Sequence, residues 1–155
     1  RHKLAVSTLQ EFNTSSHFQE ILPDSLTPSS GFRRVILCSG KVYYDLLEKR
    51  EEEKIKDIAI IRLEQLYPFP HKKLVQTLRP YQQANIIWCQ EEPMNMGAWT
   101  FLDRRLEDVL VEANIKSKRP IYVGRPEAAS PATGLISRHI LEQNLVVNQA
   151  LDLIK

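Results

Sequence analysis

The sequence predicts an α/β fold, a three-layer sandwich with a mostly parallel sheet and helices on both faces. Four short apolar runs, rich in β-branched residues, indicate buried strands at residues 35–38, 58–61, 86–89 and 121–123. A stretch with helical apolar spacing follows each run, and the connections are short. Strands that alternate with helices in this way form parallel sheets covered on both faces.

Each predicted helix carries an apolar stripe. The first spans residues 41–53, and the charge run that follows on its far side is typical of a solvated face. The second begins near Pro70, where a proline suits the first helical position. The third spans residues 99–113 with Trp99 in its buried stripe, and the fourth runs from residue 133 or 134 to residue 154. In the fourth helix four apolar residues recur at helical spacing: Ile136, Ile140, Val147 and Leu151.

The first 31 residues are weakly patterned, so we predict an arm at residues 1–31 that comes from a preceding domain and an α/β domain at residues 32–155. Within the arm, residues 8–12 suit a short helical turn and residues 17–22 a short edge strand, and prolines and serines at 23–31 mark loops. The chain begins at Arg1 without an initiator Met or a signal-peptide pattern. We therefore expect it to be a piece of a longer protein.

Composition and charge exclude two classes of partner. The formal net charge is +2 with Lys and Arg scattered along the chain, so the basic footprint of a duplex-binding protein is missing. No apolar run approaches the length that spans a bilayer. We therefore expect neither nucleic acid nor membrane as a partner. Cys38 and Cys89 each lie inside an apolar run, which indicates buried thiols in a reducing compartment and not a disulfide framework.

Two adjacent carboxylates, Glu91 and Glu92, follow the third apolar run. Ligands and partners gather at the carboxyl ends of strands in open α/β sheets. Neighbouring side chains on a strand point to opposite faces, so the two carboxylates do not share one role if the strand continues through them. No His is placed in the sequence to complete a general acid/base pair. Carboxylates at a helix start or an interface are therefore the favoured interpretation.

Other chemistry-bearing residues form no complete active site. Ser39, Gly40 and Lys41 lie between a strand and a helix, but the phosphate-loop and dinucleotide-binding patterns are absent, so we predict a tight turn there. The four histidines show no metal-ligand spacing. Arg125 and Arg138 suit bidentate contacts with a phosphate or carboxylate, and a surface ion pair explains each equally well.

Four long motifs resemble one known family. They are LCSGKVYYDL at 37–46, RLEQLYPFP at 62–70, WCQEEP at 88–93 followed by Asn95 and residues 97–99, and GRPEAASPATG at 124–134. Together they resemble the C-terminal region of the thiamine-dependent first component of the 2-oxoglutarate dehydrogenase complex. The motifs occur in the family's order and cover nearly the whole chain.

The resemblance implies a transketolase C-terminal-like domain within a larger enzyme. In that family the whole enzyme decarboxylates 2-oxoglutarate on thiamine diphosphate with Mg²⁺ and passes the succinyl unit to the lipoyl group of an acyltransferase. The two preceding domains hold the cofactor across a homodimer interface, whereas the C-terminal domain supplies dimer contacts and shapes the site entrance. Some members also bind nucleotide-like effectors. The resemblance therefore places no catalytic, cofactor-binding or metal-binding residue on this chain.

Four residues are candidates for interface or effector contacts, on the strength of their strand-end or loop positions: Tyr67, Glu91, Glu92 and Arg125. We also expect exposed apolar surface near residues 67–69 and Trp99, where lost domains or a second subunit would pack. Two alternatives stay open, the related 2-oxoadipate enzyme and a stand-alone dimerisation or effector-binding module. The expected compartment is the bacterial cytoplasm or the mitochondrial matrix.

Overall fold

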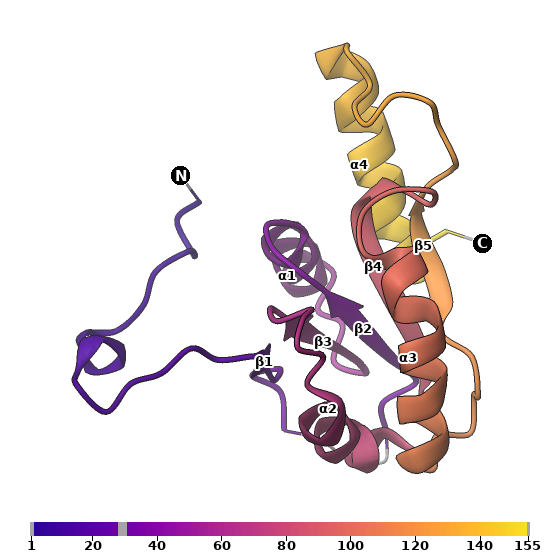
Figure 1. Ribbon diagram of the computed structural model, residues 1–155. Helices are drawn as coiled ribbons and strands as arrows, with labels where there is room; N and C mark the ends of the chain where they lie inside the picture. The colour runs from indigo at the N-terminus through magenta and orange to yellow at the C-terminus, as the bar shows by residue number, and fades with distance from the viewer. Residues whose placement is uncertain (1, 28–30, 155) are drawn as a thin grey trace.

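A five-stranded sheet lies between two layers of helices in the computed structural model, which describes residues 2–27 and 31–154 (Figure 1). The strands are β1 (Ile21–Leu22), β2 (Arg34–Cys38), β3 (Ile58–Leu63), β4 (Asn85–Pro93) and β5 (Ile121–Arg125), and their order is β1-β3-β2-β4-β5. Strands β2 to β5 are parallel, and β1 pairs antiparallel with β3. The predicted α/β sandwich is confirmed. Residues 28–30 of the predicted loop, and residues 1 and 155, lie outside the described residues.

Helices cover both faces of the sheet. One face carries α1 (Val42–Glu52) and α4 (Ile136–Ala150), and the other carries α2 (His71–Leu78) and α3 (Trp99–Glu112). Two short 3₁₀ turns, η1 (Leu9–Phe12) and η2 (Arg79–Tyr81), complete the elements. Alternate residues of β2 belong to different apolar clusters, since Leu37 packs with the α2 and α3 layer and Ile36 with the α1 and α4 layer. None of the described helices is long and apolar enough to cross a membrane.

Strand β4 is longer than the sequence predicted. The apolar run ends at Cys89, but the strand continues through both carboxylates to Pro93. The register with β5 shifts between Cys89 and Pro93, and the hydroxyl of Tyr122 on β5 donates to the Glu92 carbonyl at 3.0 Å. Glu91 and Glu92 are therefore strand residues, and their side chains alternate as strand geometry requires.

Helix α4 is shorter than predicted, and half of its apolar stripe does not reach the core. It begins at Ile136 and ends at Ala150. Val147 and Leu151 are buried, whereas Ile136 is 80% exposed and Ile140 is 54% exposed. These two residues share the spacing of the stripe but have no core beneath them, because the N-terminal part of the helix projects past the sheet (Figure 1). Periodicity shows which residues share a face, but not how far the sheet beneath them extends.

The N-terminal arm has an exposed part and an attached part. Residues 3–19 are exposed, whereas Ile21 lies in the core and pairs with Leu63 of β3. The carboxylate of Asp24 is buried and accepts hydrogen bonds from the Arg50 guanidinium and the Ile60 backbone N–H. Sheet pairing and this buried ion pair fix the chain from Ile21 onward. A domain boundary at residue 31 stays a prediction.

Candidate functional site

The candidate site lies where β2 and β4 end side by side. From β2 the chain passes through α1 to β3 on one side, and from β4 it passes through α3 to β5 on the other. This reversal makes the crevice between the two strand ends the topological switch point, where α/β sheets characteristically bind ligands. A cavity of about 540 Å³ opens there, and its lining includes Ser39, Lys41, Tyr67, Gln90, Glu91 and Glu92.

Three of the four candidate residues meet at this switch-point cavity. The Tyr67 side chain is 81% exposed, which confirms the apolar surface expected near residues 67–69. Trp99 is only half-buried, and its ring packs 5.3 Å from that of Tyr122. Glu91 points toward Lys41, with 3.3 Å between Oε1 and Nζ, whereas Glu92 is exposed. The two carboxylates therefore have separate surroundings and do not form an acid/base pair.

Lys41 is held as a charged group between two carboxylates. Its Nζ donates to Asp45 Oδ2 at 2.9 Å and lies 3.3 Å from Glu91. Partial burial lowers the pKa of Lys41, but the hydrogen bond that Lys41 donates to Asp45 and the charge of Glu91 outweigh that effect, so its pKa is raised overall. A lysine with a raised pKa stays protonated and is a poor nucleophile. The predicted turn at Ser39 and Gly40 is confirmed, with Gly40 at a φ of 71°.

Gln90 organises the cavity wall, and sequence reasoning did not single it out. Its Oε1 accepts from Trp88 Nε1 at 2.8 Å and from the Ala98 and Trp99 backbone N–H groups at 3.2 and 3.1 Å. Its Nε2 donates to the carbonyls of Met96 at 2.8 Å, Pro93 at 3.1 Å and Glu92 at 3.3 Å. This one buried amide thus provides hydrogen-bond partners for backbone groups at the start of α3 and in the loop before it. An amide inside an apolar strand was the signal, because a buried polar group needs partners.

Two glycines let the chain close around Gln90. Gly97 has a φ of 66°, and a Cβ on it would lie 2.9 Å from Gln90 Nε2. A Cβ on Gly124 would lie 2.3 Å from the Tyr122 hydroxyl. That hydroxyl donates to the carbonyls of Glu92 and Arg125, at 3.0 and 2.9 Å, which ties β5 to β4 at the register shift. Any larger side chain at either glycine would displace these contacts.

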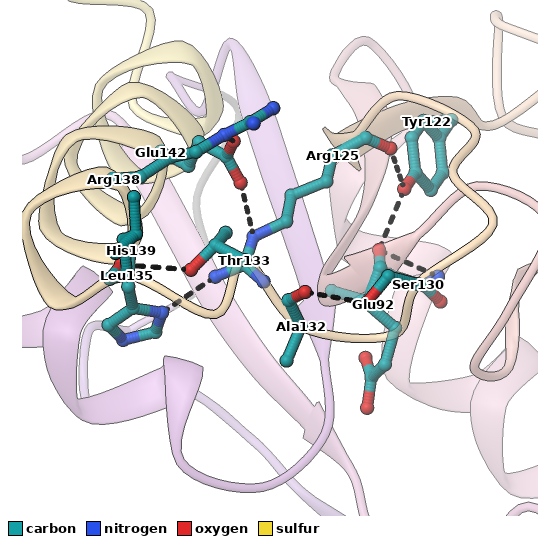
Figure 2. A network of polar contacts seen from close by, with 11 residues as sticks. Glu92, Tyr122, Arg125, Ser130, Ala132, Thr133, Leu135, Arg138, His139 and Glu142 are labelled. Atoms are coloured by element: carbon teal, nitrogen blue, oxygen red, sulfur yellow. Dashed lines mark hydrogen bonds and ion pairs between the residues drawn. The ribbon is translucent and has the colours of Figure 1, made fainter.

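Arg125, the fourth candidate, lies apart from the other three, between the end of β5 and α4. Figure 2 shows its guanidinium pointing toward Glu142 and His139 of α4. Arg125 is 8% exposed, with Nε 3.2 Å from Glu142 Oε2 and Nη2 2.8 Å from His139 Nδ1. Arg138 Nε donates to the other oxygen of Glu142 at 2.7 Å. The sequence left an ion pair as one explanation for each arginine, and the structure shows such a pair for both. Arg125 and Arg138 contact the two oxygens of the same carboxylate, that of Glu142.

The loop after β5 folds over Arg125 and joins the loop after β4. The Asn95 side chain donates to the Ala128 carbonyl at 3.0 Å and accepts from the Ala128 N–H at 3.1 Å. Ser130 donates to the Ala132 carbonyl at 2.8 Å, and Thr133 to the Leu135 carbonyl at 3.1 Å (Figure 2). This loop, Arg125 and Arg138 line a second cavity of about 460 Å³.

The described residues do not assemble a cluster of metal-ligating side chains. Across residues 2–27 and 31–154, no three His, Cys, Asp or Glu side chains are placed to hold a metal ion. Cys38 and Cys89 are free, fully buried thiols, as the sequence indicated. Mg²⁺ that carries a diphosphate is held through one or two carboxylates. At the switch-point cavity Glu91 is paired with Lys41 and Glu92 points to the other face of β4, so the two strand-end carboxylates do not converge on one ion.

Comparison with known families assigns the chain. The family model described as 2-oxoglutarate dehydrogenase C-terminal matches residues 6–151. The chain belongs to this family. Two bacterial relatives, each called 2-oxoglutarate dehydrogenase E1 component, are 49% identical in Brucella anthropi and 48% identical in Brucella ovis, over 97% of this chain. The chain spans 16% of the length of these relatives.

A solved structure with the same fold supports the assignment at the level of architecture. It is described as a split-gene transketolase, an inactive β4 tetramer, and it matches 93% of this chain and 46% of its own with a TM-score of 0.55. Sequence identity is 20%, so the likeness concerns the fold alone. The transketolase-like fold expected from the motifs of this 2-oxoglutarate dehydrogenase C-terminal domain is thereby confirmed.

Proposed function

We propose that this chain is the C-terminal domain of a 2-oxoglutarate dehydrogenase E1 component and that its own role is structural. The observation that carries the proposal is 49% identity to such a component over 97% of the chain. The parent enzyme decarboxylates 2-oxoglutarate on thiamine diphosphate and Mg²⁺ and transfers succinyl to a lipoyl-bearing acyltransferase. The cofactor is held by other domains of that parent.

The domain's contribution is to pack against the rest of the enzyme. Helix α4 and the residue before it present an apolar face with exposures between 48% and 80%, made of Leu135, Ile136, Ile140, Leu141 and Leu145. Large exposed apolar patches mark interaction sites in soluble proteins. We assign the α4 face to the second subunit of a homodimer. The surface around Tyr67, Glu91 and Glu92 faces the preceding domains of the same chain, and Arg125 holds α4 in place.

A charge on the α4 face tests this role in the full-length parent. Burying an aliphatic side chain contributes about 1.5–3 kcal/mol, so Ile136→Glu should weaken the dimer by at least about tenfold. Sedimentation velocity over a dilution series measures the change. Val111→Glu is the matched control, since Val111 is a 57% exposed apolar residue on α3 and should leave the dimer intact. Equal dimer dissociation constants for wild type and Ile136→Glu would show that α4 does not lie in the dimer interface.

A further inference from the structure

Two cysteines that the proposed function does not use form a pair across neighbouring strands. Cys38 and Cys89 are register partners in the parallel β2–β4 ladder. Both side chains belong to the same apolar cluster beneath α1 and α4, so they point to the same face of the sheet. Neighbouring strands lie about 4.8 Å apart, within the range of about 4.4–6.8 Å that Cα atoms span in disulfides. The strands therefore already hold the two Cα atoms at a spacing that a disulfide can bridge.

In the closed sheet both thiols are protected. Each is fully buried, and Cys38 Sγ lies 4.0 Å from the Ile61 carbonyl oxygen. Burial raises the pKa of Cys38 well above its ordinary value. Burial, with a smaller effect of the Glu91 charge, raises the pKa of Cys89 to about 12. The reactive thiolate is therefore scarce at neutral pH while the strands stay paired.

The position of the pair at the end of the ladder provides access. Cys38 and Cys89 are the last pair of the β2–β4 ladder, because β2 ends at Cys38, whereas β4 continues to Pro93 and stays paired with β5. Glu91, two residues after Cys89 and on the same face of β4, lines the switch-point cavity, as does Ser39 directly after Cys38. Local opening in proteins occurs at lower free energy than global unfolding, and chain ends of an element open first. Local opening at the end of β2 releases Cys38 from the ladder and exposes its thiol to a small reagent at the strand ends without unfolding the sheet, while Cys89 stays beside it on β4.

We propose that Cys38 and Cys89 are an oxidation site that a hydroperoxide converts to a cross-strand disulfide. One thiolate attacks a peroxide oxygen, which gives a sulfenic acid and, after protonation, one molecule of water from hydrogen peroxide. The second thiol then attacks the sulfenic sulfur, the S–S bond forms and a second water leaves. In sum, two thiols and one hydrogen peroxide give one disulfide and two waters. The bond would fasten the end of β2 to β4 beside the cavity, and this inference does not depend on the proposed enzyme activity.

Intact-mass measurement after hydrogen peroxide treatment tests the pair. The chain is incubated with the oxidant in native buffer, unfolded under thiol blocking and weighed, and a peptide map locates any bridge. We expect a loss of two hydrogens, a linked peptide containing Cys38 and Cys89, and full reversal by dithiothreitol. The rate should rise about tenfold per pH unit, because the thiolate fraction sets it. The bridged chain should also unfold at a higher temperature than the reduced chain.

Single-cysteine variants separate the pair from ordinary thiol oxidation. Cys38→Ser and Cys89→Ser each keep one thiol, so each should gain oxygen atoms and form no bridge within the chain. Thermal unfolding of both variants checks that the sheet is intact. The proposal is overturned if the native wild-type chain keeps two blockable thiols under conditions that oxidise the urea-unfolded chain completely. It is equally overturned if the disulfides that form join two chains.

Discussion

Replacing Gln90 with leucine should cost more stability than any other change of one polar side chain at the candidate site. Leucine has a similar volume but no polar atoms, so the buried Trp88 Nε1 loses its acceptor and the first N–H groups of α3 lose theirs. A buried polar group left without a partner costs about 1–3 kcal/mol. Three such donors, with some relief from water at the helix end, give a loss of about 4 kcal/mol.

Urea unfolding followed by circular dichroism measures this loss directly. For a domain of this size, about 4 kcal/mol corresponds to a fall in Tm of about 10 °C. Gln83→Leu is the matched control, because Gln83 is exposed and the same substitution there should change stability by less than about 0.5 kcal/mol. Hydrogen exchange at the Ala98 and Trp99 amides should quicken in Gln90→Leu. A loss below about 1 kcal/mol would refute the idea that Gln90 holds the loop and helix start.

Three further predictions concern other parts of the chain. Asp24→Ala leaves the buried Arg50 guanidinium without its carboxylate, so urea unfolding should show a loss of about 3–5 kcal/mol. Burial raises the pKa of Tyr122 to about 12, so the folded state retains this proton more tightly than the unfolded state does. The contribution of this proton to the free energy of unfolding is present below pH 10 and is lost as pH rises toward 12. Tyr122→Phe should therefore reduce the fall of unfolding free energy with pH in this range, as measured by unfolding curves at each pH. Titrating the chain with thiamine diphosphate and Mg²⁺ in a calorimeter should give no saturable heat, whereas saturation would place a cofactor site here.

The sequence predicted the order and type of the main elements because they depend on local patterns. The apolar runs that became β2 and β3 are buried on both faces, and such strands are recognisable without knowing their neighbours. The extension of β4 to Pro93 was missed because Glu91 and Glu92 carry no apolar signal. Their strand conformation depends on Tyr122, which is distant in sequence and bonds to the Glu92 carbonyl.

The candidate site was predicted only in part for a similar reason. Strand-end reasoning brought Tyr67, Glu91 and Glu92 to one cavity, because the carboxyl ends of parallel strands share an edge. The same reasoning did not show that Arg125 lies apart from these three residues, because its position depends on its contact with Glu142 of α4. The exposed Ile136 shows the same limit, since helical spacing identifies an apolar face but not the surface that covers it.

Turnover by the full-length parent tests the central claim most directly. The parent would be supplied with thiamine diphosphate and Mg²⁺, and oxo-acid oxidation would be followed with an artificial electron acceptor for 2-oxoglutarate and 2-oxoadipate in parallel. We predict a higher kcat/KM for 2-oxoglutarate. Equal or greater kcat/KM for 2-oxoadipate would assign the chain to the related enzyme, and turnover of neither acid would contradict its place in a 2-oxoglutarate dehydrogenase.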